Sequence, residues 1–208
     1  MADSIPSRTH CPHRILAIAG SLRRDSINRL LLHAAAALAP QDVQVEVYDG
    51  LGTIPMFDED NEEAVAIAGP VHTLARKVAA ADALLIATPE YNHSMPGVLK
   101  NAIDWLSRGS VGDVLVGKPV AVIGASTGRW GTRLAQAALR QVLFATESVV
   151  LNGPAVYLAN GGAAFDAQGR LINSAARASL EQVLGMLRQV PMARLAGSQP
   201  EPVPLADA

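Results

Sequence analysis

Residues 88–105, T-P-E-Y-N-H-S-M-P-G-V-L-K-N-A-I-D-W, join an apolar run to a helical pattern through a short polar turn. Two prolines stiffen this turn, and Gly97 leaves room for another group to approach the backbone closely. A planar heterocycle with imide edges needs a fixed array of backbone N–H and C=O groups beside an aromatic or apolar wall. A rigid strand-to-helix connection without a ligand is the alternative. Between the two prolines lie Glu90, Tyr91, Asn92, His93 and Ser94, a segment that can supply such groups.

A second polar segment, G-S-L-R-R-D-S-I-N at residues 20–28, lies between a buried run and the start of a helical pattern. A helix N-terminus there offers free N–H groups and the positive end of a dipole. Short donors and one of two arginines would complete a site for a phosphate monoester. The segment has neither the glycines of a dinucleotide fingerprint nor a P-loop ending. A capped helix start with solvated arginines is the alternative for Ser21, Arg23, Arg24, Ser26 and Asn28.

The third segment is G-A-S-T-G-R-W-G-T at residues 124–132, again at the end of an apolar run. Its hydroxyls and three glycines make a flexible, donor-rich loop that can close over the other side of the same ring. Arg129 can meet a second phosphate or a partner subunit. A mobile loop without a ligand is the alternative.

Other reactive residue types carry weaker signals. The single cysteine, Cys11, lies in a polar leader without a scaffold, and His93 is more typical of a surface histidine than of a general base. The acidic residues of segment 58–63 suit a solvated loop. The order and spacing of a Ser-His-Asp triad or a metal site are absent from the sequence. We therefore predict no catalytic side chain and no metal.

The positions of these segments follow from alternating periodicities. Apolar or period-two runs predict strands at 14–21, 43–48, 83–87, 119–125 and 149–158. Helical spacing predicts helices at 27–38, 62–80, 98–106, 134–143 and about 173–188. Gly69-Pro70 interrupts the second helix, which can instead begin near Pro70, and the alternation at 43–48 favours a strand near an edge.

Alternating strands and helices predict an α/β fold: a three-layer, doubly wound sheet of five parallel strands with helices on both faces. Ligands of such sheets lie beyond the carboxyl ends of the strands. The three polar segments follow the first, third and fourth strands, so we expect them to meet there. A phosphate anchor beside two walls for a flat ring describes a mononucleotide, and FMN fits best.

Composition narrows the function classes. The chain has 208 residues, half of them apolar, and a net charge of -2, which disfavours a broad grip on nucleic acid. One cysteine fits a reducing cytoplasm, and the apolar runs are too short for a membrane span. We expect a flexible leader at 1–13, one domain at 14–192 and a disordered, proline-rich tail at 193–208.

Together the three motifs, with P-E-Y-N-H-S-M-P-G-V-L-K-N-A-I-D-W-L-S-R and G-K-P-V-A-V-I-G-A-S-T-G at their centre, resemble the NADPH-dependent FMN reductase family of flavodoxin-like proteins. This family includes chromate and quinone reductases and azoreductases. The resemblance covers about 14–186. It implies non-covalent FMN, NADPH or NADH as co-substrate, and a homodimer or homotetramer. His93 and Thr132 depart from the family pattern near the expected position of the substrate or partner subunit.

The resemblance also implies residue roles. The FMN phosphate would be held by Ser21, Arg23, Ser26 and Asn28. The isoalloxazine would be lined by Pro89, Glu90, Tyr91 and Asn92, with Ser94 supporting the turn. The ring or ribityl chain would be flanked by Ser126, Thr127 and Gly128.

The expected activity is hydride transfer from NAD(P)H through bound FMN to a small-molecule acceptor, a quinone, azo compound, chromate or flavin, by a ping-pong mechanism. FMN supplies the redox chemistry, so no acid, base or nucleophile is needed. One alternative is a flavodoxin-like electron carrier or FMN-binding module without significant NAD(P)H turnover. Another is a domain that binds a different phosphorylated ligand.

Overall fold

The computed structural model describes residues 12–190. The strands are β1 (His13–Ala19), β2 (Val43–Tyr48), β3 (Ala83–Ala87), β4 (Pro119–Ala125), β5 (Val149–Val150) and β6 (Tyr157–Leu158). The α-helices are α1 (Ile27–Leu38), α2 (Glu62–Ala66), α3 (Gly69–Ala80), α4 (Gly97–Leu106), α5 (Arg133–Ala145) and α6 (Ser174–Gln189). Short 3-10 turns are η1 (Leu51–Thr53), η2 (Glu59–Asn61), η3 (Gly109–Val111) and η4 (Gly161–Ala164). Cys11, most of the predicted leader and the whole predicted tail lie outside the described residues.

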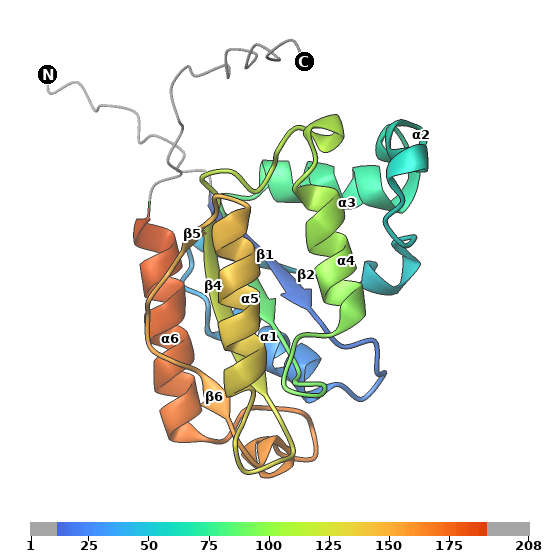
Figure 1. Ribbon diagram of the computed structural model, residues 1–208. Coiled ribbons are helices and arrows are strands. Elements are labelled where there is room, and N and C mark those ends of the chain that lie inside the picture. The colour runs from blue at the N-terminus through green and yellow to red at the C-terminus, as the bar shows by residue number, and fades with distance from the viewer. Residues whose placement is uncertain (1–11, 191–208) are drawn as a thin grey trace, which may run out of the picture.

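The sheet has the order β2-β1-β3-β4-β5, with β6 also paired to β4, and every pairing is parallel. The order runs outward in both directions from β1 and β3, so the sheet is doubly wound. Helices cover both of its faces (Figure 1). The predicted flavodoxin-like fold is therefore confirmed.

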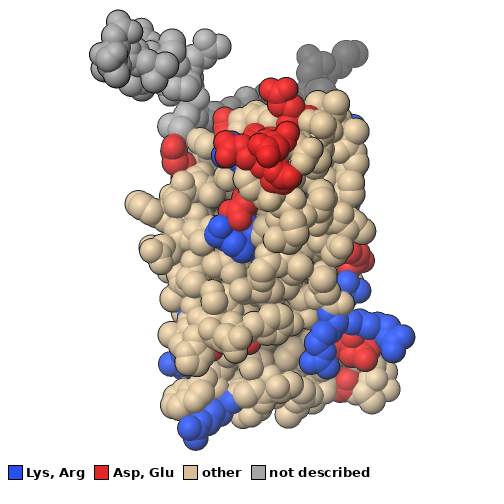
Figure 2. All heavy atoms as spheres, turned by 45° about the vertical axis from the view of Figure 1, so that its right-hand side comes forward, with Lys and Arg blue, Asp and Glu red and all other residues tan. Residues whose placement is uncertain are grey.

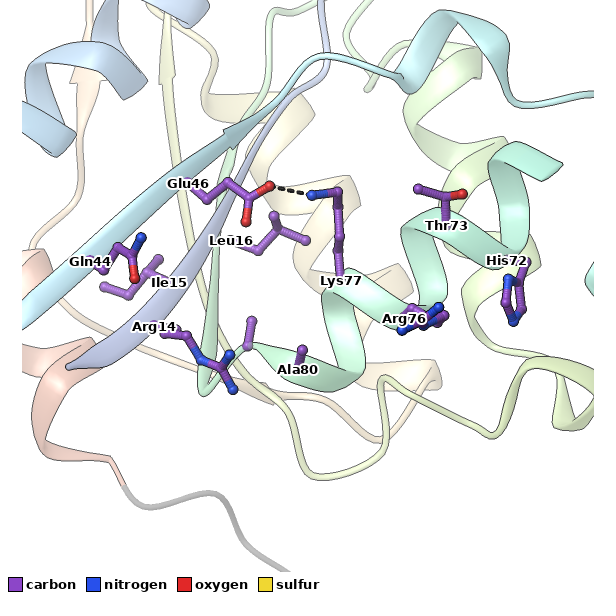
Figure 3. Close-up of a pocket in the computed structure, with 11 residues that line it drawn as sticks. Arg14, Ile15, Leu16, Gln44, Glu46, His72, Thr73, Arg76, Lys77 and Ala80 are labelled. Atoms are coloured by element: carbon purple, nitrogen blue, oxygen red, sulfur yellow. Dashed lines mark hydrogen bonds and ion pairs between the residues drawn. The ribbon is translucent and has the colours of Figure 1, made fainter. Parts of the chain in front are cut away.

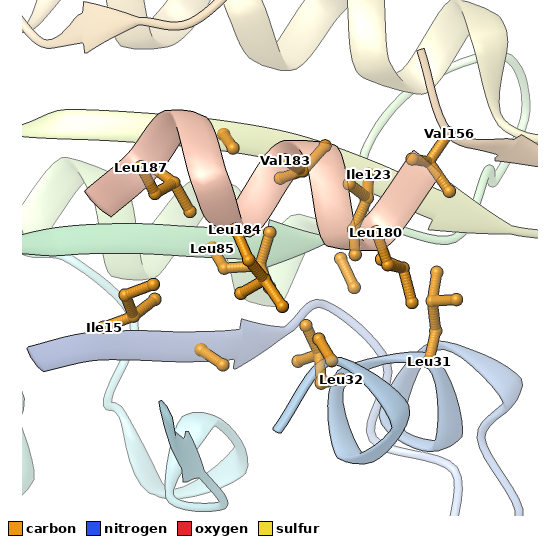
Figure 4. Close-up of a cluster of buried hydrophobic side chains, with 14 of the residues drawn as sticks. Ile15, Leu31, Leu32, Leu85, Ile123, Val156, Leu180, Val183, Leu184 and Leu187 are labelled. Carbon is orange, nitrogen blue, oxygen red and sulfur yellow. The ribbon is translucent and has the colours of Figure 1, made fainter. Parts of the chain in front are cut away.

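Two apolar layers, one on each face, hold the helices to the sheet. On one face, α1 and α6 pack on the central strands through Leu31, Leu32, Leu180 and Leu184 (Figure 4). On the other face, α3, α4 and α5 pack through a second cluster that includes Leu74, Leu99, Trp105 and Leu139. Burial of these side chains is the main stabilising term of the fold. None of the helices within residues 12–190 is long and apolar enough to cross a membrane.

Strand β2 lies at the edge of the sheet, as its alternating pattern predicted. Val43, Val45 and Val47 pack against the α1 layer, whereas Gln44 and Glu46 point to the other face and are exposed. These two polar side chains and α3 border a hollow, whereas Tyr48, at the end of the same strand, is buried in the second apolar cluster.

The predicted fifth strand, 149–158, is wrong as one continuous element. It forms two short strands, β5 and β6, both parallel to β4 and separated by residues 151–156. Pro154 has no N–H to donate to a ladder, which breaks the strand at this point. The Leu151 carbonyl accepts a bond from the Arg140 guanidinium at 2.8 Å.

The predicted helix at 62–80 is divided in the structure, as the alternative start near Pro70 anticipated. A short α2 ends at Ala66, and α3 begins at Gly69 with Pro70 in its first turn. Gly69 has a φ of 78°, which is unstrained only for glycine. The change of direction between the two helices thus depends on this residue.

Candidate functional site

The loops after β1, β3 and β4 meet at the carboxyl end of the sheet, at the lower end of the molecule in Figure 1. Backbone bonds continue beyond the strands: Gly20 N donates to Ala87 O at 2.8 Å, and Thr88 N donates to Ile123 O at 3.0 Å. The structure therefore brings together the three segments that carry the predicted site residues.

The first loop presents two buried hydroxyls at the start of α1. Ser21 and Ser26 are each 5% exposed. Ser26 Oγ caps the helix by accepting from Arg29 N at 3.3 Å, and Ser21 Oγ accepts from Arg23 N at 3.4 Å. Because both oxygens act as acceptors in these bonds, both O–H groups remain as donors. The Arg23 side chain is exposed beside them.

Asn28 connects the first loop to the third. Its side-chain amide donates to Ala125 O at 2.9 Å and accepts from Ala125 N at 2.8 Å, across 97 residues of sequence. The side chain is 2% exposed, so both bonds are protected from water. The structure gives Asn28 a bridging role that the sequence did not indicate, and its contact with a phosphate stays a prediction.

The second loop is a tight hairpin. Tyr91 N donates to Ser94 O at 2.9 Å, and Ser94 N donates to Tyr91 O at 3.0 Å. The two central residues, Asn92 and His93, have φ values of 49° and 65°. Positive φ at both central positions is characteristic of a type I′ turn, and it strains a non-glycine residue. The sequence predicted a rigid turn from its prolines but not this left-handed pair, for which Asn92 was the available signal.

Glu90, at the entrance to this hairpin, reaches the N-terminus of α5. Its Oε2 accepts from Leu134 N at 2.9 Å and from Ala135 N at 3.0 Å. The carboxylate is thus engaged by a helix. A flat ring bound at this loop would therefore meet the backbone of Glu90 and not its side chain.

The third loop is fixed by a fourth segment that sequence reasoning missed. Ser126 N donates to Leu158 O at 2.9 Å, and its carbonyl accepts from Gly161 N at 2.8 Å. Asn160 N donates to Gly128 O at 3.1 Å, and Gly128 N donates to Ser126 Oγ at 3.0 Å. The Asn-Gly-Gly run at 160–162 signals a turn in the sequence, but nothing there indicates where the turn packs. Thr127 and Gly128 are exposed.

Thr132 and His93, the two departures from the family pattern, differ in position. Thr132 is fully buried, and its Oγ1 accepts from Gln136 Nε2 at 3.0 Å. A Cβ on Gly124 would lie 2.0 Å from that hydroxyl and 2.5 Å from Thr88 O, so only glycine fits at this position of β4. Thr132 is therefore a packing residue and does not face a substrate, whereas His93 is exposed on the hairpin.

The conspicuous N-A-I-D-W block has a structural role. Asn101 accepts from Phe57 N at 2.7 Å and donates to Pro55 O at 2.8 Å, and Trp105 Nε1 donates to the same carbonyl at 2.9 Å. These bonds fasten the loop after η1 to α4. Trp105 is a core residue of the second apolar cluster.

Two hollows lie away from these loops. One, of about 470 Å³, lies between β2 and α3, where Lys77 forms an ion pair with Glu46 and Arg14 and Arg76 line the opening (Figure 3). The other, of about 950 Å³, is lined by Glu59, Asp60, Glu62 and Glu63, in the acidic patch of Figure 2. Neither is lined by a predicted cofactor residue. Within residues 12–190, no group of three or more His, Cys, Asp or Glu is placed to hold a metal ion.

Arg108 forms ion pairs with two carboxylates of the acidic patch. Its guanidinium contacts Glu62 at 2.7 Å and Glu59 at 3.6 Å. Hydrogen bonds from Arg108 and Ser110 lower the pKa of Glu62. The charge of the patch is thus partly neutralised within the chain. The solvated loop expected at 58–63 is instead the turn η2 and the start of α2.

Comparison with known proteins identifies the family. The family model described as NADPH-dependent FMN reductase matches residues 13–163. The chain is 46% identical over 175 residues to an NAD(P)H-dependent FMN reductase of Pseudomonas aeruginosa, an alignment that covers 84% of this chain and 93% of the relative. It is 42% identical over 168 residues to a 2-hydroxy-1,4-benzoquinone reductase of a Burkholderia species, covering 81% of this chain and 90% of the relative.

A solved structure agrees with these sequence relatives. The flavoenzyme NAD(P)H:(acceptor) oxidoreductase FerB of Paracoccus denitrificans superposes with a TM-score of 0.75 at 32% identity, covering 84% of this chain and 94% of that one. The predicted oxidoreductase class and the FMN and NAD(P)H pair are thereby confirmed. The chain belongs to the NADPH-dependent FMN reductase family.

Proposed function

We propose that this chain is an NAD(P)H:quinone-type oxidoreductase that holds FMN non-covalently across the three loops. The observation that carries the proposal is the placement of two buried hydroxyls at the start of α1 beside the strained hairpin after β3. These groups fit a phosphate and a flat ring with hydrogen-bonding edges. The quinone preference is supported by the names of the Burkholderia relative and of a 38% identical quinone reductase of Escherichia coli.

The phosphate end of FMN would be held at the first loop. Ser21 and Ser26 would donate their hydroxyl protons to phosphate oxygens, because both already accept a backbone N–H. Arg23 would add a charge-assisted bond from the exposed side. The dipole of the 12-residue helix α1 points its positive end at the same place. Asn28 would keep this loop at a fixed distance from β4.

The ring would lie on the hairpin and under the third loop. The backbone of Pro89, Glu90, Tyr91 and Asn92 would present N–H and C=O groups to its edge, and the Tyr91–Ser94 pair would fix their directions. On the opposite side the ring or ribityl chain would meet Ser126, Thr127 and Gly128. When bound, FMN supplies hydride acceptance from NAD(P)H and delivery of two electrons to the acceptor.

The protein would contribute by orienting the two substrates at the flavin. Tyr91 is 48% exposed, and with His93 it borders the face at which nicotinamide and acceptor would bind in turn. Use of one face by both substrates is the physical reason for a ping-pong mechanism. Azo compounds, chromate and free flavin would reach the same open face, so we propose them as secondary acceptors. The cytoplasmic location and the homodimeric or homotetrameric state stay predictions.

One spectrum tests the central proposal. FMN is added to the purified protein, and visible absorption is recorded before and after anaerobic addition of NADPH or NADH. We expect a perturbed flavin spectrum that bleaches on reduction and returns when a benzoquinone is added. Parallel initial-rate lines with the same two substrates would support ping-pong kinetics.

The alternatives give different results. Bound FMN that neither NADPH nor NADH reduces would favour an electron carrier or FMN-binding module. The net charge of -2 disfavours a carrier that docks by electrostatic attraction. A spectrum unchanged by the protein would mean that the crevice binds a different phosphorylated ligand.

A further inference from the structure

We propose that Glu90 is a positioning residue whose carboxylate locks the hairpin after β3 to the N-terminus of α5, and so sets the two walls of the site relative to each other. The inference rests on the proposed function, because the walls are those that would hold the flavin ring. It assigns the side chain a role distinct from the ring-lining role of the backbone.

The carboxylate replaces a cap that α5 lacks. Helices α1 and α6 are capped by their own Ser26 and Asn173. The residue before α5, Thr132, forms no capping bond, and its hydroxyl instead accepts from Gln136. Glu90 Oε2 supplies the missing acceptor, at 2.9 Å from Leu134 N and 3.0 Å from Ala135 N, across 44 and 45 residues of sequence.

Charge adds to the geometry. The first turn of α5 contains no acidic residue, so the positive end of this 13-residue helix receives its negative charge from Glu90. Glutamine would keep an acceptor oxygen at the same reach but lose the charge. Alanine would lose both. The two substitutions therefore separate the hydrogen bonds from the electrostatic contribution.

The position of Glu90 makes the link relevant to the site. On one side, Thr88 is held by the sheet through its N–H and by its own Oγ1 bond to Pro89 O at 2.8 Å. On the other side, the strained Asn92 and His93 follow within three residues. Strained backbone persists only where its surroundings determine it, and Glu90 fixes the segment between the sheet and the strained pair.

The bonds from Glu90 also fix one end of the third loop. At its beginning, Ala125 is fixed by Asn28, and at its end the start of α5 is fixed by Glu90. Residues 126–132 thus span two anchored points, one of which belongs to the hairpin. Loss of the carboxylate would release the hairpin and one end of the third loop together.

The test compares Glu90→Ala, Glu90→Gln and a matched control, Asn173→Ala, which removes the side-chain cap of α6, a helix on the opposite face of the sheet from α5. Amide hydrogen exchange at residues 134, 135 and 176 reports the caps directly, and FMN titration reports the site. In Glu90→Ala we expect lost protection at 134 and 135 and an FMN Kd raised about tenfold, the size of a lost cap. In Glu90→Gln we expect a rise of about threefold, the electrostatic share.

The control separates positioning from stability. Asn173→Ala is expected to lose protection at 176, lower the midpoint of denaturation and leave the FMN Kd within about twofold of wild type. Unchanged protection at 134 and 135 in Glu90→Ala would overturn the proposed bonds. Lost protection with an unchanged FMN Kd would overturn the positioning role.

Two further results are decisive. If Glu90→Ala does not fold, Glu90→Gln carries the comparison, and a wild-type FMN Kd together with wild-type kcat/KM in that variant would contradict the electrostatic contribution. A wild-type protein that does not bind FMN would instead overturn the proposed function. Failure of the inference therefore shows only in the variants, and failure of the proposed function shows already in the wild type.

Discussion

The carboxyl end of the sheet and the hollow between β2 and α3 both carry polar groups, but they are organised differently. At the carboxyl end, buried or part-buried side chains bond to backbone groups of distant segments, as Asn28 does with Ala125 and Gln136 with Val156. In the hollow, charged side chains face water, and the Lys77–Glu46 pair has side chains 38% and 54% exposed. Arg14 and Arg76 are exposed beside it.

The difference indicates which region is built for a defined ligand geometry. Hydrogen bonds protected from water fix the loops that make them, since breaking one leaves a buried group without a partner. Exposed ion pairs contribute about 0–1 kcal/mol and leave their long side chains free to move. We therefore expect a preorganised binding site at the carboxyl end, where the loops are held in place, and a solvated surface at the hollow, despite its volume. The following predictions test this contrast, from the largest effect to the smallest.

Removal of the phosphate contacts should have the largest effect. In Ser21→Ala/Arg23→Ala we expect the FMN Kd to rise at least about 150-fold, because two bonds to a charged group cost about 3 kcal/mol or more together. The fold should persist. FMN titration followed by flavin fluorescence measures the change, with Arg24→Ala as the control for a neighbouring exposed arginine. If the control and the double variant lost FMN affinity equally, the phosphate would have to bind elsewhere.

Asn28→Ala should mainly affect stability. It leaves the N–H and C=O of Ala125 without their side-chain partner in a buried position, which costs about 2–4 kcal/mol. Asp82→Ala is the comparison at the opposite end of the sheet, where an exposed carboxylate accepts from Arg14 N at 2.7 Å. We expect its cost to stay below about 1 kcal/mol. Urea unfolding of the two variants measures the free energy that each one loses. Similar losses would contradict the contrast between the carboxyl end of the sheet and its exposed surface.

His93→Gly should stabilise the protein slightly. Glycine adopts the φ of 65° without strain, so we expect the free energy of unfolding to rise by about 0.5 kcal/mol after the added entropy of the unfolded chain. Glu147 has a similar φ of 57° at the end of α5, far from the site, and Glu147→Gly is the matched variant. Thermal unfolding compares them. A loss of stability in His93→Gly alone would show that its imidazole makes a contact that offsets the strain.

Periodicity predicted the first four strands and four of the five helices, because burial forces apolar residues onto one face. The edge position of 43–48 followed from its alternating pattern, and the helix start near Pro70 followed from the Gly69-Pro70 pair. The fifth strand failed because β-branched residues on both sides of Gly153-Pro154 suggested continuity, while the missing N–H of Pro154 decided the outcome. The sequence shows both the strand propensity and the proline. Which of them decides the outcome depends on whether a neighbouring strand needs a hydrogen bond at that position.

For the site, the sequence predicted which loops meet but not which side-chain hydrogen bonds join them. Asn28 and Glu90 were both predicted as cofactor contacts, because the segments that contain them meet in the predicted crevice. Their bonds to Ala125 and to the first turn of α5 span 97 and 44 residues, a separation that local patterns do not encode. Thr132 was expected near the substrate or a partner subunit, and its packing against Gly124 could not be predicted for the same reason, because it depends on the tertiary fold.

The smallest effect is expected at the hollow between β2 and α3. Arg14→Gln/Arg76→Gln removes two exposed guanidinium groups from its opening, and surface changes of this kind shift stability by no more than about 0.5 kcal/mol. Because no protected hydrogen bond joins these side chains to the loops at the carboxyl end, the FMN Kd should stay within about twofold of wild type, as should kcat/KM for NADPH. Isothermal titration and steady-state rates measure both. A change above about fivefold in either quantity would mean that the hollow is energetically coupled to the site, and the division of the molecule into a preorganised end and a solvated surface would then be wrong.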